Sequence, residues 1–305
     1  MMTLVTKMMM ILAFLVSFFL NGNAQLLYKI SGNGLAKPSY IIGTYHLAPV
    51  SFADSIPGLQ EALAASEQVY GELDMTDMMS ADNLQKFQAA MMLPEGKKLS
   101  TLLTVEEMGR LNVVLKELMG MDMNNPMLAQ QLDGLSPQTL QTQLSLLIYM
   151  KKHDGFNPQA TFDGYFQEVA KQQGKGVGGL ETIEFQIETL FHGSSLERQK
   201  ELLMCLVDNL EHTELMAEQL IHAFFAQDLV GVKAVIDEKE QNQCDYTLEE
   251  EDQLINNRNA NWAVLMPQIM ADKATFFAVG AGHLPGEKGV LQLLKNAGYT
   301  IEGVK

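Results

Sequence analysis

Two stretches far apart in the chain decide the fold: "YIIGTYHLAP" at residues 40–49 and "FFAVGAGHLPG" at residues 276–286. Each stretch runs from an apolar segment that is typical of a strand into Gly-x-x-His-Leu. In open α/β sheets, ligands bind at the edge where strands end and helices begin. If the two strands are parallel neighbours, His46 and His283 lie at the same edge of one sheet. We therefore expect the two histidines to share one site.

A glycine stands three residues before each histidine, Gly43 in the first stretch and Gly280 in the second. Glycine lets the backbone turn sharply and approach a ligand closely. A carboxylate is expected at the same edge, because the strand predicted for "QVYGELD" at residues 68–74 ends near Glu72. The sequence thus predicts two imidazoles and one carboxylate around one point.

Two histidines and a carboxylate support two kinds of chemistry. They are ligands for a zinc- or manganese-class ion that keeps an open position for water. Such an ion lowers the pKa of the bound water and polarises a carbonyl, which drives hydrolysis. A His–Glu pair can also work without metal, as a general base and the group that orients it. A third interpretation is that each histidine only caps a turn, and the repetition of the whole unit weakens that interpretation without removing it.

The sequence patterns in the rest of the chain predict strands near its beginning and end, with helices between them. Residues 26–74 contain a strand hairpin, a helix and a third strand. Residues 76–265 carry mostly helical patterns, and residues 270–305 read as strand, helix and strand. The fold class is therefore α/β (α+β), a mixed sheet flanked by helices with a large helical insertion between the first and last strand-rich segments.

Two predicted helices have defined ends. In "SFADSIPGLQEALAAS", Asp54 or Ser55 is expected to cap the helix, with Pro57 in its first turn. In the helical middle, Thr104 opens a capping box with the glutamate three residues later, and Gly120 suits the C-terminal end.

The first 24 residues have the pattern of a cleaved secretory signal. Lys7 precedes an apolar run at residues 8–20, and "NGNA" places small residues before a cleavage point. A single domain is expected over residues 25–305. The protein is then exported, to a periplasm or outside the cell, and contacts a membrane only through this signal before cleavage.

Charge and cysteine content limit the partners. Without Lys7, 20 basic residues stand against 37 acidic ones, a net charge of −17. An acidic surface repels phosphate backbones, so nucleic acid and anionic membranes are not expected as partners. Cys205 and Cys244 are the only cysteines. In an oxidising compartment they could form one disulfide, and the sequence leaves that open.

Other acidic and histidine side chains are given structural roles. Asp133 and Asp163 are predicted to be caps or surface carboxylates. The four remaining histidines are predicted to lie at the surface: His153, His192, His212 and His222.

Several blocks in the chain resemble the TraB/GumN family, which is related to the TIKI-type proteases. They are "YIIGTYHLAP", "VYGELD", "FDGYFQEVAKQQGKGVGGLETIEFQ", "NNRNANW" and "AVGAGHLPGEKGVLQLLKNAGY", in that order over nearly the whole chain after residue 24. The resemblance implies an EreA/ChaN-like fold with a mixed sheet, surrounding helices and a long helical insertion.

The resemblance also implies a site and its residues. The two Gly-x-x-His elements and an acidic residue correspond to His46, His283 and Glu72. Arg258 in "NRN" matches a family arginine suited to bind a carboxylate or stabilise an oxyanion. Glu181 and Gln186 match another shared block, and Glu181 is expected to support a ligand histidine.

The function expected from these features is metal-dependent hydrolysis, with a peptide or protein as substrate. Manganese, cobalt or zinc would be held by His46 and His283, with Glu72 as a further ligand or as the general base, and no organic cofactor is expected. The alternative is a non-catalytic protein of the same fold that sequesters a peptide or haem. Hydrolysis of a non-peptide ester is a third option. The sequence leaves the oligomeric state open.

Overall fold

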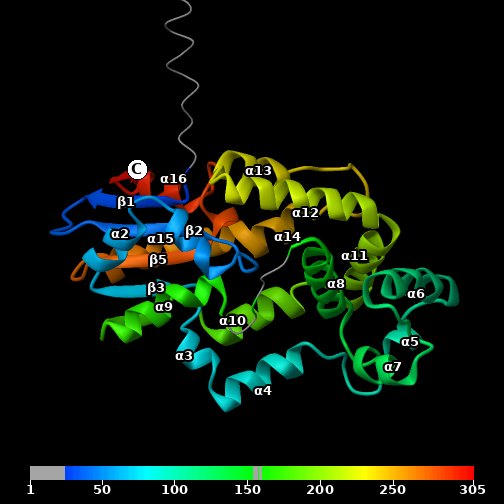
Figure 1. Cartoon of the computed structure of the whole chain (residues 1–305). Coiled ribbons are helices and arrows are strands. Elements are labelled where there is room, and N and C mark those ends of the chain that lie inside the picture. The colour runs from blue at the N-terminus through cyan, green and yellow to red at the C-terminus, as the bar shows by residue number, and fades with distance from the viewer. Residues whose placement is uncertain (1–24, 154–156, 158–159) are drawn as a thin grey trace, which may run out of the picture.

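The computed structural model describes residues 25–153, 157 and 160–305. The predicted secretory signal, residues 1–24, lies outside this range. One end of the molecule contains the sheet, and the other is built from helices (Figure 1).

The sheet has six strands in the order β4-β3-β5-β2-β1-β6. Their bounds are β1 Leu27–Gly32, β2 Ser39–Thr44, β3 Gln68–Gly71, β4 Gly176–Gly179, β5 Thr275–Gly280 and β6 Tyr299–Gly303. β1 pairs with β2 and β6 in antiparallel fashion, whereas β2, β5, β3 and β4 run parallel to one another. The mixed sheet and the first hairpin are as the sequence predicts.

The two strands that open the Gly-x-x-His elements are parallel neighbours. β2 pairs with β5 so that Thr44 lies opposite Gly280. On the other side of β5, β3 is also parallel, with Tyr70 opposite Phe277. The carboxyl ends of β2, β5 and β3 therefore meet at one edge, which confirms the topological expectation.

Helices surround the sheet and form the insertion (Figure 1). In chain order they are η1 Val50–Ser55, α2 Leu59–Ala65, α3 Met75–Met78, α4 Ala81–Ala90, α5 Leu99–Leu102, α6 Val105–Met119, α7 Pro126–Leu132, α8 Pro137–Lys152, α9 Phe162–Gln172, α10 Ile183–Ile187, η2 Glu188–His192, α11 Leu196–Asp208, α12 Leu210–Phe225, α13 Leu229–Ile236, α14 Leu248–Glu251, η3 Asp252–Asn256, α15 Asn257–Met270, η4 Ala281–His283 and α16 Val290–Asn296. η1 and η4 are 3-10 helices, and η2 and η3 are π-helical.

The predicted helix ends are partly right. Thr104 forms its capping box with Glu107, and Gly120 ends α6 in the left-handed conformation with a φ of 75°. The predicted helix start at Asp54 or Ser55 is wrong. These residues close a 3-10 turn, and α2 begins only after Gly58, whose φ of 68° is a left-handed conformation that glycine adopts without strain.

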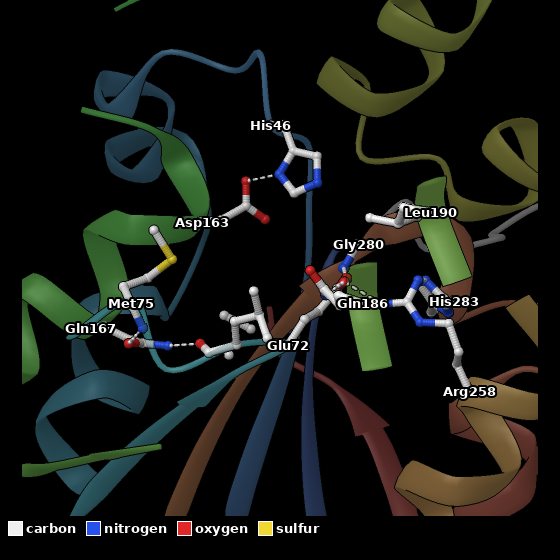
Figure 2. A pocket seen from close by; sticks show the side chains of 13 residues that line it. His46, Glu72, Met75, Asp163, Gln167, Gln186, Leu190, Arg258, Gly280 and His283 are labelled. Carbon is white, nitrogen blue, oxygen red and sulfur yellow. Dashed lines mark hydrogen bonds and ion pairs between the residues drawn. The ribbon is translucent and has the colours of Figure 1, made fainter. Parts of the chain in front are cut away.

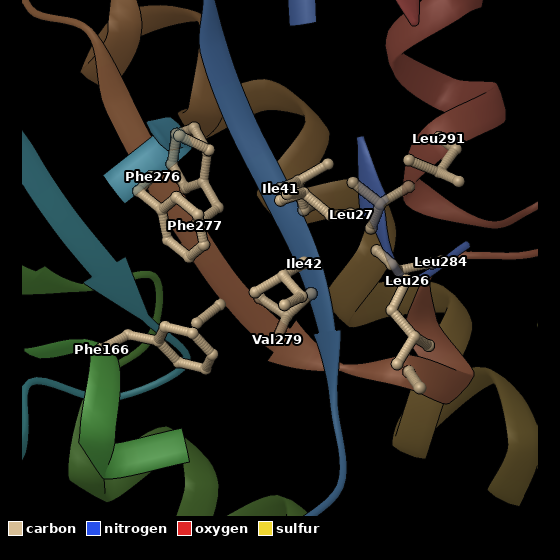
Figure 3. Close-up of a cluster of buried hydrophobic side chains, with 14 of the residues drawn as sticks. Leu26, Leu27, Ile41, Ile42, Phe166, Phe276, Phe277, Val279, Leu284 and Leu291 are labelled. Carbon is tan, nitrogen blue, oxygen red and sulfur yellow. The ribbon is translucent and has the colours of Figure 1, made fainter. Parts of the chain in front are cut away.

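Helices pack on both faces of the sheet. Phe166 of α9 stacks on Phe276 of β5 on one face, with ring centroids 5.4 Å apart. Adjacent residues in a strand point to opposite faces, so Phe277 lies on the other face. There Gln68 of β3 donates to the carbonyl of Ile269 in α15. Figure 3 shows Phe276, Phe277 and the neighbouring aliphatic side chains in this buried cluster, which fixes the strand ends that carry the site.

The helical insertion has a buried cluster of its own, built mainly from aliphatic side chains of α6, α7, α8 and α11. A disulfide joins Cys205 in α11 to Cys244 in the loop before α14, so the open question of their pairing is answered. None of the described helices is both long enough and apolar enough to cross a bilayer.

Candidate functional site

A pocket of about 230 Å³ opens at the edge where β2, β5 and β3 end. Its walls include His46, Glu72, Arg258 and His283, four of the residues that the sequence analysis selects. Figure 2 shows them arriving from different segments, with Glu72 between the two histidines. The predicted convergence of distant residues on one pocket is therefore seen in the structure.

His46 belongs to a short chain of side chains at the pocket mouth. Its Nδ1 lies 2.6 Å from Oδ2 of Asp163, the second residue of α9. The hydroxyl of Thr44, the last residue of β2, donates to the other oxygen of Asp163. The negative charge of Asp163 raises the pKa of His46 to about 9, although partial desolvation opposes the shift. The His46 ring is thus held through Nδ1 and is protonated at pH 7, so Nε2 would have to lose its proton before it could bind a metal ion.

His283 lies deeper, with only 5% of its surface exposed. Its Nδ1 is 2.7 Å from Oδ1 of Asn259, an acceptor, so Nδ1 carries the proton and Nε2 carries the lone pair. Nη1 of Arg258 donates to that Nε2 over 3.2 Å. Burial, helped by the positive charges of Arg258 and His46, lowers the pKa of His283 to about 4. This imidazole is therefore neutral at pH 7.

Glu72 is the first residue after β3, and both of its carboxylate oxygens accept hydrogen bonds. Oε1 accepts from the Gly280 amide at 2.8 Å, and Oε2 accepts from Nη2 of Arg258 at 2.6 Å. Gln186 donates to Oε2 at 3.3 Å. Burial alone would raise the pKa of Glu72, but the charges of His283, Arg258 and His46 and the Gly280 amide lower it to about 2. Glu72 is an anion throughout the physiological range.

Arg258 is oriented from behind by Glu181. The two oxygens of Glu181 accept from Nε and Nη2 of Arg258 at 2.7 and 2.9 Å, and Oε1 also accepts from Trp262. The expectation that Glu181 supports a ligand histidine is wrong: its partners are Arg258 and Trp262. Asn259 and Asp163 support the histidines instead. Gln186 reaches Glu72, as a supporting residue should.

The two predicted glycines are needed because the backbone is crowded at this edge. A Cβ on Gly43 would lie 3.0 Å from the Cα of Ala281, so β2 and the loop after β5 could not approach as closely. A Cβ on Gly280 would lie 3.2 Å from Oε1 of Glu72, where its amide makes the hydrogen bond. Both positions therefore keep the strand ends close to the site.

The donor atoms of the site fit a metal ion in their chemistry. Histidines that bind metal usually donate the other ring N–H to a carboxylate, carbonyl or water, and both His46 and His283 direct Nδ1 to an oxygen. Both Nε2 atoms and the Glu72 carboxylate suit a zinc- or manganese-class ion. Among residues 25–153, 157 and 160–305, however, no three His, Cys, Asp or Glu side chains are arranged to hold one. Arg258 contacts the atoms of Glu72 and His283 that an ion would need.

The site also contains residues that sequence reasoning missed. Asp163 was predicted to be a cap or surface carboxylate; its side chain is 21% exposed and binds His46. Asp133 does act as a cap, accepting from the amide of Ser100. Asn259 lies next to Arg258 in "NNRNANW", and the sequence alone gives it no role. Its position one residue from a predicted site arginine was the signal available.

The remaining histidines lie outside the pocket, but not all are fully exposed. His192 and His222 are exposed, as predicted. His212 pairs with Glu240 at 2.6 Å and is partly buried. His153 is also partly buried, because its ring stacks on Tyr149 at a centroid distance of 4.8 Å, and the surface prediction fails there.

Comparison with known proteins defines the class. The model of the TraB/PrgY/gumN family matches residues 26–303, so the chain belongs to this family. It is 25% identical over 308 residues to the metalloprotease TIKI2 of Danio rerio, covering 87% of this chain and 58% of that protein. The metalloprotease TIKI1 of Homo sapiens is also 25% identical, over 87% of this chain and 59% of its own. The metalloprotease TIKI homolog of Nematostella vectensis is 24% identical, over 88% and 65%.

The chain therefore spans somewhat more than half the length of these curated relatives. No solved structure matches it. The EreA/ChaN-like detail of the predicted fold accordingly stays a prediction, while the mixed sheet with surrounding helices is observed.

Proposed function

We propose that the chain is a metal-dependent hydrolase that acts on peptides at the pocket between His46 and His283. The observation that carries the proposal is the matched orientation of the two histidines. Each comes from a Gly-x-x-His element on neighbouring parallel strands, and each directs Nδ1 to an oxygen, which leaves Nε2 as the ligand atom of the ring. At His283, Arg258 would have to release Nε2 before an ion could bind there. A divalent ion of the manganese, cobalt or zinc class would be held by His46, His283 and Glu72.

Each residue has a distinct part in this proposal. The ion, when bound, would polarise the scissile carbonyl and lower the pKa of a water molecule. Glu72, with a pKa of about 2, is suited to bind a cation and is a poor proton acceptor. Arg258 is fixed by Glu181 and lines the pocket, where its guanidinium can stabilise an oxyanion as negative charge develops. Asp163 and Asn259 orient the imidazoles.

The comparisons support a peptide as substrate. The curated relatives that align with most of this chain are named metalloproteases. The pocket wall includes apolar Leu73, Met75 and Leu190, which suit a side chain of a peptide. The match covers only 58–65% of those relatives, so a peptide substrate is proposed for this chain and is not taken over from them.

We also propose that the protein works outside the cytoplasm. Disulfides persist in oxidising compartments such as the periplasm or the extracellular space. The Cys205–Cys244 disulfide supports this location, as does the predicted signal at residues 1–24.

Metal content is the first test. Purified protein is equilibrated with manganese, cobalt or zinc, desalted and measured by elemental analysis beside His46→Ala and His283→Ala. We expect the wild type to retain one ion and both variants to lose it. His222→Ala, which changes an exposed histidine of α12, is the matched control and should retain the ion.

Turnover is tested on the same four proteins with a diverse peptide library. We expect metal-dependent cleavage by the wild type and by His222→Ala only. A wild type that retains metal and cleaves no peptide would contradict peptide hydrolysis. Cleavage that survives both His46→Ala and His283→Ala would contradict the site.

Sequestration of a peptide without turnover is the second candidate, and one observation favours it. Arg258 already pairs with Glu72 and donates to Nε2 of His283. The negative charge of Glu72 is therefore compensated without a metal ion. Peptide binding that needs no metal and is unchanged in His46→Ala would support this candidate over hydrolysis.

A further inference from the structure

A second cavity lies behind the loop that carries His283. Its volume is about 660 Å³, within the range of about 300–1,000 Å³ that small-molecule sites occupy. It is lined by residues from α13, the segment from Tyr246 to η3, the start of α15 and the loop at residues 282–289. We call this the rear cavity. We call the pocket between His46 and His283 the catalytic pocket, and none of its lining residues lines the rear cavity.

The rear cavity is lined by apolar side chains, by glycine backbone and by a few charged side chains. Its apolar walls are Ile236, Tyr246, Leu254, Ile255 and Pro285. Glycine backbone at residues 282, 286 and 289 completes the loop side. Apolar walls with a few polar groups are typical of sites for small organic ligands.

The charges at the rear cavity are mostly compensated. Lys233 pairs with Asp237 at 2.6 Å, Lys288 pairs with Asp252 at 2.9 Å, and Glu251 pairs with Lys239. An anionic ligand would have to break one of these pairs or leave its own charge uncompensated, which costs free energy. The remaining charged lining residue, Glu287, is exposed to solvent, where pairing with a ligand cation adds little. Charge complementarity therefore favours a neutral ligand.

We propose that the rear cavity is a binding site for a neutral, largely apolar small molecule. This site goes beyond the proposed hydrolase activity and does not depend on it. A molecule bound there would contact residues 282 and 285–289 of the loop that also carries His283.

One side chain connects the two cavities. Asn259 accepts from Nδ1 of His283 through Oδ1, and its Nδ2 donates to the carbonyl of Lys288 at 2.9 Å. Lys288 lines the rear cavity, and His283 lines the catalytic pocket. A ligand that shifts the loop at Lys288 changes the hydrogen bond that orients His283. We therefore expect a ligand in the rear cavity to change the orientation of the His283 ring in the catalytic pocket.

The binding test uses N-phenyl-1-naphthylamine, a neutral dye whose fluorescence rises in apolar surroundings. Ile236 is 42% exposed at the end of α13 and lines the cavity, so Ile236→Glu places a charge there without disturbing the core. Val230→Glu is the matched control, because Val230 is 78% exposed on the same helix and is not among the lining residues. Leu190→Glu places the same charge in the catalytic pocket.

We expect saturable dye binding by the wild type, Val230→Glu and Leu190→Glu, and an affinity lower by about tenfold or more in Ile236→Glu. No saturable binding by the wild type would overturn the site. Equal binding by Ile236→Glu and Val230→Glu would overturn it as well, and so would a loss confined to Leu190→Glu.

The coupling has its own readout in the imidazole nitrogen resonances of His283, measured by NMR as dye is added. We expect them to move in the wild type and in Val230→Glu, and to stay in place in Ile236→Glu. Resonances of His283 that do not respond to bound dye in the wild type would overturn the coupling.

Discussion

The two Gly-x-x-His elements place their histidines in opposite electrostatic states. Both follow neighbouring parallel strands and both direct Nδ1 to an oxygen. Yet the side chain of His46 is 73% exposed and its pKa is raised to about 9, whereas His283 is buried and its pKa is lowered to about 4. The same local motif therefore gives a protonated imidazole at the pocket mouth and a neutral one at its base.

The difference comes from burial and from the partner at Nδ1. A carboxylate, Asp163, stabilises the charged form of His46. At His283, burial penalises the charged form, the Nδ1 partner is the uncharged amide of Asn259, and Arg258 faces Nε2. Motif and strand register locate the two histidines, but residues from α9 and α15 decide their protonation.

The largest expected effect comes from Arg258→Ala, because Arg258 is buried and is the partner of two carboxylates, the buried Glu181 and the partly buried Glu72. It leaves Glu72 and Glu181 without their cation, and breaking a buried ion pair costs about 3–5 kcal/mol. Urea unfolding at pH 7 measures the loss. Arg110→Ala removes an exposed pair with Asp208 and should cost less than about 1 kcal/mol. Equal losses in the two variants would contradict the assigned role of Arg258.

The second prediction uses the pH dependence of stability in metal-free protein. The pKa of His283 is about 4 when folded and 6.5 in its ordinary state, so between these values the unfolded chain binds more protons. The stabilising contribution is present above pH 6.5 and is lost as the pH falls towards 4, by about 3 kcal/mol in total at about 1.4 kcal/mol per pKa unit. His283→Gln should lose this slope in urea unfolding between pH 7 and 4.

His46 should behave in the opposite sense. Its raised pKa adds stability that is fully present below pH 6.5 and is lost as the pH rises through about 9. The effect should be smaller than that of His283, because the exposed ring is screened by solvent. If the unfolding free energies of the wild type and His283→Gln run parallel from pH 7 to 4, the contrast between the two histidines fails.

The third prediction exchanges the partners. Asp163→Asn should lower the pKa of His46 from about 9 towards 6.5, because the amide carries no charge. Asn259→Asp should raise the pKa of His283 above about 4 for the converse reason. Titration of the imidazole resonances by NMR measures both shifts. Asp82→Asn, a change at an exposed residue of α4, is the control and should move neither pKa.

The strands themselves and the meeting of distant residues could be predicted from sequence, because apolar strand patterns and glycines are local signals. Gly43, Gly280 and the ends of their strands are examples. Asp163 could not be recognised, because its place near the start of a helix is equally typical of a cap. Only the packing of α9 against the sheet through Phe166 brings it to His46.

The role of Glu181 was missed for a related reason. Family resemblance located the residue but not the direction of its side chain. That direction depends on Trp262 and Arg258, one turn apart on α15, both of which donate to Glu181. The π-helical segment η3 immediately before α15 also carries the Leu254 carbonyl that holds Nη1 of Arg258, and nothing in the sequence indicated a π-helix there.

The smallest expected effect concerns how the two histidine loops are held. The hydroxyl of Tyr149, in α8 of the helical insertion, donates to the carbonyl of Leu47 at 2.8 Å, one residue after His46. Tyr149→Phe should cost about 1 kcal/mol, the net value of one hydrogen bond. It should speed amide hydrogen exchange at residues 45–49 but not at residues 281–284, which Asn259 holds instead. Tyr40→Phe removes a hydroxyl from β2 and should leave both loops unchanged. Equal acceleration in the two loops would mean that the insertion supports the whole site and not His46 alone.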